Sequence, residues 1–334
     1  MGEHSKSSII KYTRKYLGMT QEELAENICD PVTLARYESG KLNPSDEKFC
    51  LLMQKMGMSG EQYVIPVQNA KASHETQMKN ILHALEREDF EEVEKNINFL
   101  KKDSTFLMEN IENKQYIKRL ELMINYEMGE IEAGEYIESL ETILKWTFKD
   151  YDENYFPIHR VFTENEVLII SNIARQYAQM GKTELAIHLY YNLEDYFQTD
   201  VVINDYKPRY IELLSLSNLL GLSKRYDESI KICKRGIQWL LKYDKSNYLY
   251  NFYYNIGWII NKKIQGGMEN PEAMKQAKCY IWLAYQLCQI YPENKENANH
   301  ILKFYKDSFK SISEEGLNCN KLKEEEEYPK KYKN

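Results

Sequence analysis

Two stretches near the N-terminus decide how this chain is interpreted: T-Q-E-E-L-A at residues 20–25 and A-R-Y-E-S-G-K-L-N-P-S at residues 35–45. Thr20 with Glu23 three residues later forms a capping box, which is typical of the start of a helix. Asp30 and Pro31 start a second helix, because Asp is a good N-cap and proline at the first helical position loses no hydrogen bond. Gly40 ends that helix. The spacing therefore predicts two short helices joined by a tight turn.

Helices paired in this way form a helix-turn-helix, whose second helix can lie in the DNA major groove while the first crosses the backbone. Residues 20–29 form the predicted first helix and residues 31–39 the second. Arg36 could pair with guanine or phosphate, and Val32 or Thr33 could touch a thymine methyl group. The predicted DNA-binding residues are Gln21, Val32, Thr33, Arg36 and Lys41, with Lys11 and Arg14 as further candidates for phosphate contacts.

Two alternatives stay open for this head. Arg36 could instead pair with Glu38 or Glu22 as a surface charge, or the head could have lost DNA binding. Residues 1–66 hold eight Lys/Arg and nine Asp/Glu, a net charge of −1. DNA contact must therefore come from locally arranged cations, because the head as a whole is not basic.

Length and composition suit a small domain followed by a larger one. The chain has 334 residues, 43% of them apolar and 28% charged, as in ordinary globular proteins. No apolar run approaches the roughly 18 residues that a membrane span needs, and the N-terminus has no signal-peptide pattern. The six cysteines form no C-x-x-C pair, so we expect reduced thiols. These features predict a cytoplasmic protein with no membrane segment.

After about residue 67 the sequence changes to long amphipathic helices separated by short turns. Tetratricopeptide-like spacing is found around the small residues Ala174, Ser217 and Gly257. They are 43 and 40 residues apart, against an ideal of about 34, so the repeats are degenerate. The helical periodicity also places Leu82 and Trp146 in the core.

The expected fold class is all-α: an N-terminal helix-turn-helix domain followed by a tetratricopeptide-like right-handed superhelix of paired helices. The expected domains are a DNA-binding domain at 1–66, a peptide-binding and dimerisation domain at 67–315, and a disordered tail at 316–334.

In such repeats the first helix of each pair lines the concave face, through positions two before and one after the small residue. An asparagine amide there can both donate to and accept from a peptide backbone, and so hold an extended ligand. The alternative is that each asparagine is only a helix cap or a surface residue, since the chain is rich in Asn. The predicted peptide-binding residues are Asn172, Arg175, Asn218, Asn255 and Trp258, with Ser215 at the remaining groove position.

Enzyme signatures are missing from the sequence. The six histidines form no i, i+4 pair and no H-E-x-x-H, so the sequence predicts no metal site. There is no P-loop, no G-x-G-x-x-G and no G-x-S-x-G. We expect a protein that is not an enzyme and uses no cofactor.

The two N-terminal stretches resemble the Cro/repressor-type helix-turn-helix of phage and bacterial regulators. Together with the repeat body, the whole chain resembles the Rgg/PlcR/PrgX (RRNPP) peptide-responsive quorum-sensing regulators. The resemblance implies a cytosolic homodimer that binds a double-stranded DNA operator and a short signalling peptide in the concave groove, using groove asparagines. One rival interpretation is a helical scaffold that sequesters a protein partner, with a head that does not read DNA. Another is a regulator with the same head that senses no ligand.

Overall fold

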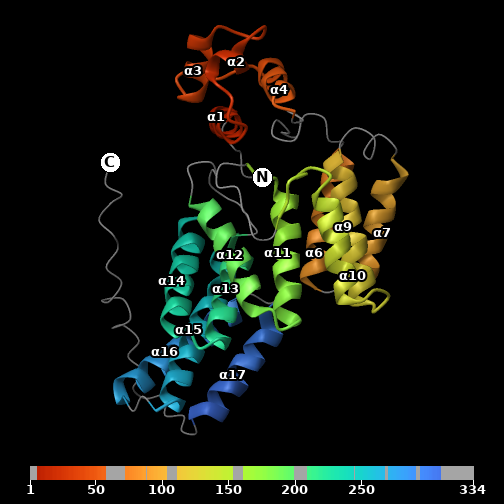
Figure 1. The fold of residues 1–334 in the computed structure, drawn as a ribbon. Coiled ribbons are helices and arrows are strands. Elements are labelled where there is room, and N and C mark those ends of the chain that lie inside the picture. The colour runs from red at the N-terminus through yellow and green to blue at the C-terminus, as the bar shows by residue number, and fades with distance from the viewer. Residues whose placement is uncertain are drawn as a thin grey trace. The chain divides into compact units, whose positions relative to one another are not determined.

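The computed structural model describes residues 6–57, 72–87, 89–103, 111–152, 161–198, 209–243, 245–267, 270–290 and 294–309. All elements assigned within these ranges are helices (Figure 1). The chain divides into two compact units, Met1–Pro208 and Arg209–Asn334. The predicted domain boundary at residues 66–67 and the predicted tail at 316–334 lie outside the described residues.

The head consists of four short helices, drawn in red to orange in Figure 1: α1 (Lys6–Tyr16), α2 (Gln21–Ala25), α3 (Pro31–Glu38) and α4 (Asp46–Lys55). The predicted capping box is present, because the Thr20 hydroxyl accepts from the Glu23 N–H at 3.1 Å and the Glu23 carboxylate accepts from the Thr20 N–H at 2.7 Å. The core of the head consists of fully buried side chains from all four helices, Ile9, Ile10, Leu24, Leu34, Phe49, Leu52 and Met53.

Helix α2 is shorter than predicted. The sequence predicts a helix to residue 29, whereas the structure ends it at Ala25. Asn27 has a φ of 63°, in the left-handed region that Asn enters more readily than most non-glycine residues. The backbone already leaves the helix at Glu26, whose ψ is 127°, and the left-handed Asn27 that follows cannot resume it, so the prediction for this end was wrong. The predicted end of α3 is close, because Gly40 follows it with a φ of 72°.

The remainder of the first unit contains three helix pairs: α6 (Ala72–Glu86) with α7 (Phe90–Lys102), α9 (Ile111–Glu127) with α10 (Ala133–Leu144), and α11 (Glu164–Gln179) with α12 (Thr183–Phe197). Gly129 and Gly181 both adopt positive φ in the turn inside their pair, so the same turn recurs. Helices α9 and α11 are joined by buried polar contacts, in which Asn165 accepts from Arg119 at 2.8 Å and donates to Gln115 at 2.9 Å.

The second unit contains α13 (Arg209–Leu222), α14 (Tyr226–Lys242), the short 3₁₀ helix η1 (Ser246–Tyr248), α15 (Leu249–Gln265), α16 (Pro271–Ile290) and α17 (Lys295–Phe309). Each α-helix packs on the next along the chain, and α13 also contacts α15 (Figure 1). The helical repeats predicted from the small residues are therefore present as successive antiparallel pairs. No described helix is long and apolar enough to cross a membrane.

The small residue predicted at Gly257 is required by packing. A Cβ atom built on Gly257 would lie 2.4 Å from Ile281 Cγ1 and 3.0 Å from the Ala277 carbonyl oxygen of α16. Gly236 on α14 has a similar role, because a Cβ there would lie 2.3 Å from the ring of the buried Phe252. These glycines let α15 approach both of its neighbours closely.

Two predicted core residues are not buried. Leu82 keeps 42% of its surface exposed and Trp146 keeps 40%. Trp146 lies in the turn directly after α10, where helical periodicity no longer determines which way a side chain points. The sequence prediction was wrong for both residues.

We predict that Gly257→Ala destabilises the second unit by about 1 kcal/mol, because overpacking typically costs about 2 kcal/mol and alanine gains roughly 1 kcal/mol in helix propensity. Urea unfolding followed by tryptophan fluorescence measures this, since Trp239, Trp258 and Trp282 lie in that unit. Gly134→Ala on α10 is the control, because its Cβ would meet nothing within 4 Å. A Gly257→Ala protein as stable as the wild type would contradict the packing argument.

Candidate DNA-binding and peptide-binding sites

Helix α3 has one face fixed in the head and one face open. Leu34 is fully buried and Tyr37 nearly so, and together they anchor the inner face. On the other side Val32 is 62% exposed and Arg36 is exposed, with Thr33 half-buried between them. An exposed valine beside an arginine on a short helix is the chemistry needed to touch a thymine methyl group and a guanine edge. Lys41, also exposed, follows in the turn after α3.

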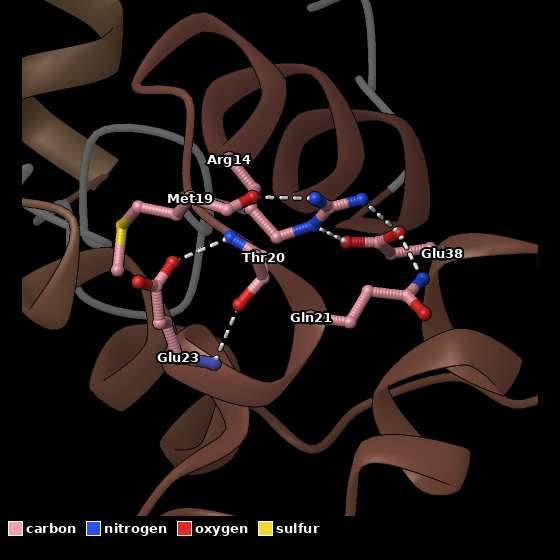
Figure 2. Close-up of polar contacts among 6 residues, drawn as sticks. All are labelled: Arg14, Met19, Thr20, Gln21, Glu23 and Glu38. Carbon is pink, nitrogen blue, oxygen red and sulfur yellow. Dashed lines mark hydrogen bonds and ion pairs between the residues drawn. The ribbon is translucent and has the colours of Figure 1, made fainter.

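A buried polar network holds α3 against α1 and α2 (Figure 2). Arg14 of α1 donates from Nε and Nη2 to the two carboxylate oxygens of Glu38 at 2.6 and 2.9 Å, a bidentate ion pair. Its Nη1 also donates to the Met19 carbonyl at 2.6 Å. Gln21 of α2 donates from Nε2 to Glu38 Oε2 at 2.7 Å. One carboxylate at the end of α3 thus connects three helices.

The ion pair is buried on both sides, with 12% of the Arg14 side chain and 5% of the Glu38 side chain exposed. Hydrogen bonding to Glu38 raises the pKa of Arg14 against the opposing effect of burial, so the guanidinium keeps its charge. Charge-assisted bidentate bonds of this kind fix orientation as well as adding energy. The network therefore sets the position of α3 relative to α1.

This network changes two sequence interpretations. Arg14 was a candidate for a phosphate contact, and that is wrong, because its guanidinium is held inside the head by Glu38. The alternative in which Arg36 pairs with Glu38 is also wrong, since that carboxylate already accepts from Arg14 and Gln21. No ion pair to Arg36 is present within the described head, to Glu22 or to any other carboxylate.

Gln21 lies where the sequence placed it, at the first position of α2. Its amide nitrogen is directed to Glu38, which fixes the side chain that was predicted to meet a phosphate. Sequence reasoning missed Arg14 and Glu38 as a pair. The only signal was Glu38 beside Tyr37 on the inner side of the predicted helix, and its partner lies 24 residues earlier in the chain.

In the second unit, two predicted peptide-binding asparagines come together. Asn255 of α15 donates from Nδ2 to Asn218 Oδ1 on α13 and, at 3.1 Å, to the hydroxyl of Ser217. The Asn218 amide nitrogen and the Asn255 amide oxygen have no partner within the described residues, and Asn218 is exposed. The pair thus offers one donor and one acceptor, the set that a peptide bond needs.

Trp258 lies one turn beyond Asn255 on α15 and is half-buried. Its Cζ3 atom would lie 3.2 Å from a Cβ built on Gly221 of α13, so the indole ring packs where that glycine leaves space. Lys262 Nζ lies 5.6 Å from the centre of the Trp258 ring, within the range of a cation–π contact. The ring therefore extends the Asn218–Asn255 pair into a surface with polar and aromatic parts.

The other two predicted groove residues, Asn172 and Arg175, lie on α11 in the first unit. The Asn172 amide nitrogen is buried without a hydrogen-bond partner within the described residues. Arg175 is exposed and its guanidinium lies 3.8 Å from the Glu127 carboxylate of α9. In the part of the chain that the structure describes, no cluster of His, Cys, Asp and Glu could hold a metal ion.

Comparison with known proteins identifies the head first. Residues 10–62 match the helix-turn-helix family. This segment is a helix-turn-helix domain. No curated protein matches this sequence.

Two solved structures share the fold over nearly the full chain. One is PlcR from Bacillus thuringiensis in complex with the peptide PapR7 and DNA, which is 18% identical with a TM-score of 0.55, over 92% of this chain and 100% of PlcR. The other is PlcR of the same organism in its apo form, which is 16% identical with a TM-score of 0.53, over 91% and 99%. The all-α fold class, with a helix-turn-helix head followed by paired helices, is thereby confirmed.

We predict that Arg14→Met destabilises the head by about 3 kcal/mol, because it leaves the Glu38 carboxylate buried without its cation. Amide hydrogen exchange of α1 and α3 in the full chain measures this. Tryptophan fluorescence follows the rest of the protein separately, since all four tryptophans lie outside residues 1–66. Lys15→Met, next to Arg14 but exposed, is the control. Equal exchange rates in the two variants would show that the ion pair does not hold the head together.

Proposed function

We propose that this chain is a cytoplasmic transcription regulator. Its helix-turn-helix head binds a double-stranded DNA operator through α3, and its helical body binds a short signalling peptide that controls this activity, as in quorum sensing. The observation that carries the proposal is the open face of α3, with Val32 and Arg36 exposed on a helix whose inner face is fixed.

The DNA role follows from the chemistry of that face. Arg36 can make two hydrogen bonds to guanine, and Val32 can pack on a thymine methyl group in the major groove. Lys41 follows α3 and can neutralise a phosphate, and Gln21 at the start of α2 can contact the backbone through the second N–H of the amide that it donates to Glu38. Because the net charge of the head is −1, these few cations must supply the local electrostatic attraction to DNA. The family match at residues 10–62 supports this assignment.

The peptide role rests on the Asn218–Asn255 pair. These amides are already ordered by their mutual hydrogen bond, so a peptide backbone can pair with the remaining donor and acceptor at little extra entropic cost. Trp258 beside them offers an apolar surface for a side chain. The shared fold with PlcR, whose structure was solved with a peptide and DNA, supports a peptide as the ligand.

Control by the peptide requires that it bind two states of the protein with different affinity, because a ligand shifts an equilibrium only by that difference. In a homodimer, the conformation of the body would determine the spacing of the two heads. These heads must bind two half-sites that lie one helical turn, or a multiple of one turn, apart on the DNA. The bound peptide would then change the affinity of the protein for its operator without itself contacting DNA.

We predict that Arg36→Ala weakens binding to the specific operator about 10- to 100-fold, because a bidentate base contact is worth about 1–3 kcal/mol. Lys41→Ala should weaken binding to all sequences alike and reduce the salt slope by about one. Mobility shift with DNA from upstream of the gene, across a salt series, measures both. Lys15→Ala, an exposed cation on α1, is the control. Unchanged operator affinity for Arg36→Ala would reject its role, and wild-type protein without specific binding would favour the protein-scaffold alternative.

We predict that Asn218→Ala and Asn255→Ala each weaken peptide binding by about 5- to 10-fold, the equivalent of one net hydrogen bond of about 1 kcal/mol. Isothermal calorimetry with short peptides encoded beside the gene measures this, and circular dichroism checks that the body stays folded. Asn192→Ala on α12 is the matched control, since its amide pairs with His188 on the same helix. Wild-type affinity in both groove variants would place the peptide elsewhere.

A further inference from the structure

Helix α11 carries a row of amide side chains on the face that is directed at α9. Asn165, Asn172 and Gln179 recur at intervals of seven residues, which places them on one side of the helix. At one end of the row Asn165 donates to Gln115 of α9 at 2.9 Å, and at the other end Gln179 accepts from the Tyr126 hydroxyl of α9 at 3.3 Å. Asn172 therefore lies between these contacts, opposite the middle of α9.

The two ends of this row are hydrogen-bonded, whereas its middle is not. The amide nitrogen of Asn172 is buried without a partner within the described residues. Gln176, one turn further along the same face, is fully buried, and neither its amide nitrogen nor its amide oxygen has a partner there. In this part of α9 the buried residues Leu122 and Ile124 are apolar, so their side chains can supply no hydrogen bond.

A third buried polar group reaches the same place from α10. Tyr136 is fully buried, and its hydroxyl has no hydrogen-bond partner within the parts of the chain that the structure describes. Its ring stacks on the ring of Tyr126, with the centroids 4.8 Å apart. The hydroxyl of Tyr126 in turn binds Gln179, which lies one turn from Gln176 on α11. Tyr136 and Gln176 are thus both next to the Tyr126–Gln179 contact.

The charges that act on Tyr136 agree with this position. Burial raises the pKa of the Tyr136 hydroxyl, and the positive charges of Arg175 and Arg119 oppose the rise. The guanidinium of Arg175 lies 3.8 Å from the Glu127 carboxylate, towards one end of the row, and Arg119 donates to Asn165 at the other end. The Tyr136 hydroxyl is therefore within electrostatic reach of both ends of the row.

We propose that ordered water is bound between α10 and α11 and bridges Tyr136 to Asn172 and Gln176. The unpartnered groups include both donors and acceptors, because the Asn172 nitrogen donates, whereas the Gln176 amide and the Tyr136 hydroxyl can each do both. A buried water typically makes about three hydrogen bonds, to polar groups that would otherwise be unsatisfied. The three side chains supply such a set.

Other small ligands suit these groups less well. An apolar ligand would leave the buried amides unpaired, which is costly. A cation would be repelled by the charges of Arg175 and Arg119, and an anion cannot donate to the amide oxygen of Gln176. Water is small and both donates and accepts, so it satisfies all of these groups.

The water would join two successive helix pairs of the first unit, since α10 belongs to one pair and α11 to the next. It also gives Asn172 a role in the fold, separate from the peptide contact that the sequence predicts for this residue. The inference does not depend on the operator or the peptide. It can fail while the proposed function holds, and the reverse.

The first test is the variant Tyr136→Phe, which removes one oxygen atom and keeps the ring that stacks on Tyr126. If the hydroxyl binds water, its loss weakens the bridge, and we expect the amides of α10 and α11 to exchange hydrogen about 5-fold faster in the full chain. If the hydroxyl is unpaired, its removal stabilises the packing instead. Exchange as slow as in the wild type, or slower, would overturn the proposal. Tyr190→Phe is the matched control, because its buried hydroxyl donates directly to the Ser171 carbonyl at 3.2 Å and its loss should also speed exchange.

The second test is crystallography of the full chain, which locates the water directly. We expect electron density for water within hydrogen-bond distance of the Tyr136 hydroxyl and of the Asn172 and Gln176 amides. This density should be lost in Gln176→Met, whose side chain has a similar length but cannot bind water in this way. Gln286→Met, at an exposed position of α16, should keep it. Direct hydrogen bonds among the three side chains, with no water between them, would overturn the proposal.

Discussion

The buried ion pair between Arg14 and Glu38 is the constraint on which the head depends. Removing two charges from water is costly, and the cost is recovered only when the geometry is good and the remaining lone pairs are satisfied. Here the guanidinium binds both carboxylate oxygens and the Met19 carbonyl, and Gln21 donates to the same carboxylate. The arrangement leaves α3 little freedom to rotate. The contacts on the buried face of α3 therefore determine which of its residues are exposed.

The second unit depends on a different constraint, the close approach of its helices at glycine residues. Gly257 and Gly236 leave no room for a side chain, and α15 lies against its neighbours through them. Close contact between α13 and α15 also brings Asn218 and Asn255 within hydrogen-bond distance and lets Trp258 pack at Gly221. The candidate peptide surface of the second unit is thus a product of helix packing.

The outer faces of the repeat helices differ from one another in charge. Residues that do not stabilise the fold are free to vary in charge, and in this chain α10 carries the exposed carboxylates Glu135 and Glu138 whereas α14 carries the exposed lysines Lys231, Lys234 and Lys242. Sequence periodicity placed Trp146 in the core, but this residue lies in the turn after α10, where helical periodicity no longer applies, and it is exposed.

The sequence by itself determined the helix-turn-helix, through the capping box at Thr20, the Asp30–Pro31 start and the glycine at 40, because caps and turns depend on local chemistry. It also determined the repeat pairs, through small residues at helical spacing. Only the tertiary structure decided that Arg14 belongs to the interior, that α2 ends at Ala25, and that Asn218 and Asn255 meet. The two pairings join residues 24 and 37 positions apart, and local periodicity carries no information about which distant side chains come into contact. The early end of α2 depends on the extended ψ of Glu26 and the left-handed backbone of Asn27, conformations that these residue types allow but do not impose.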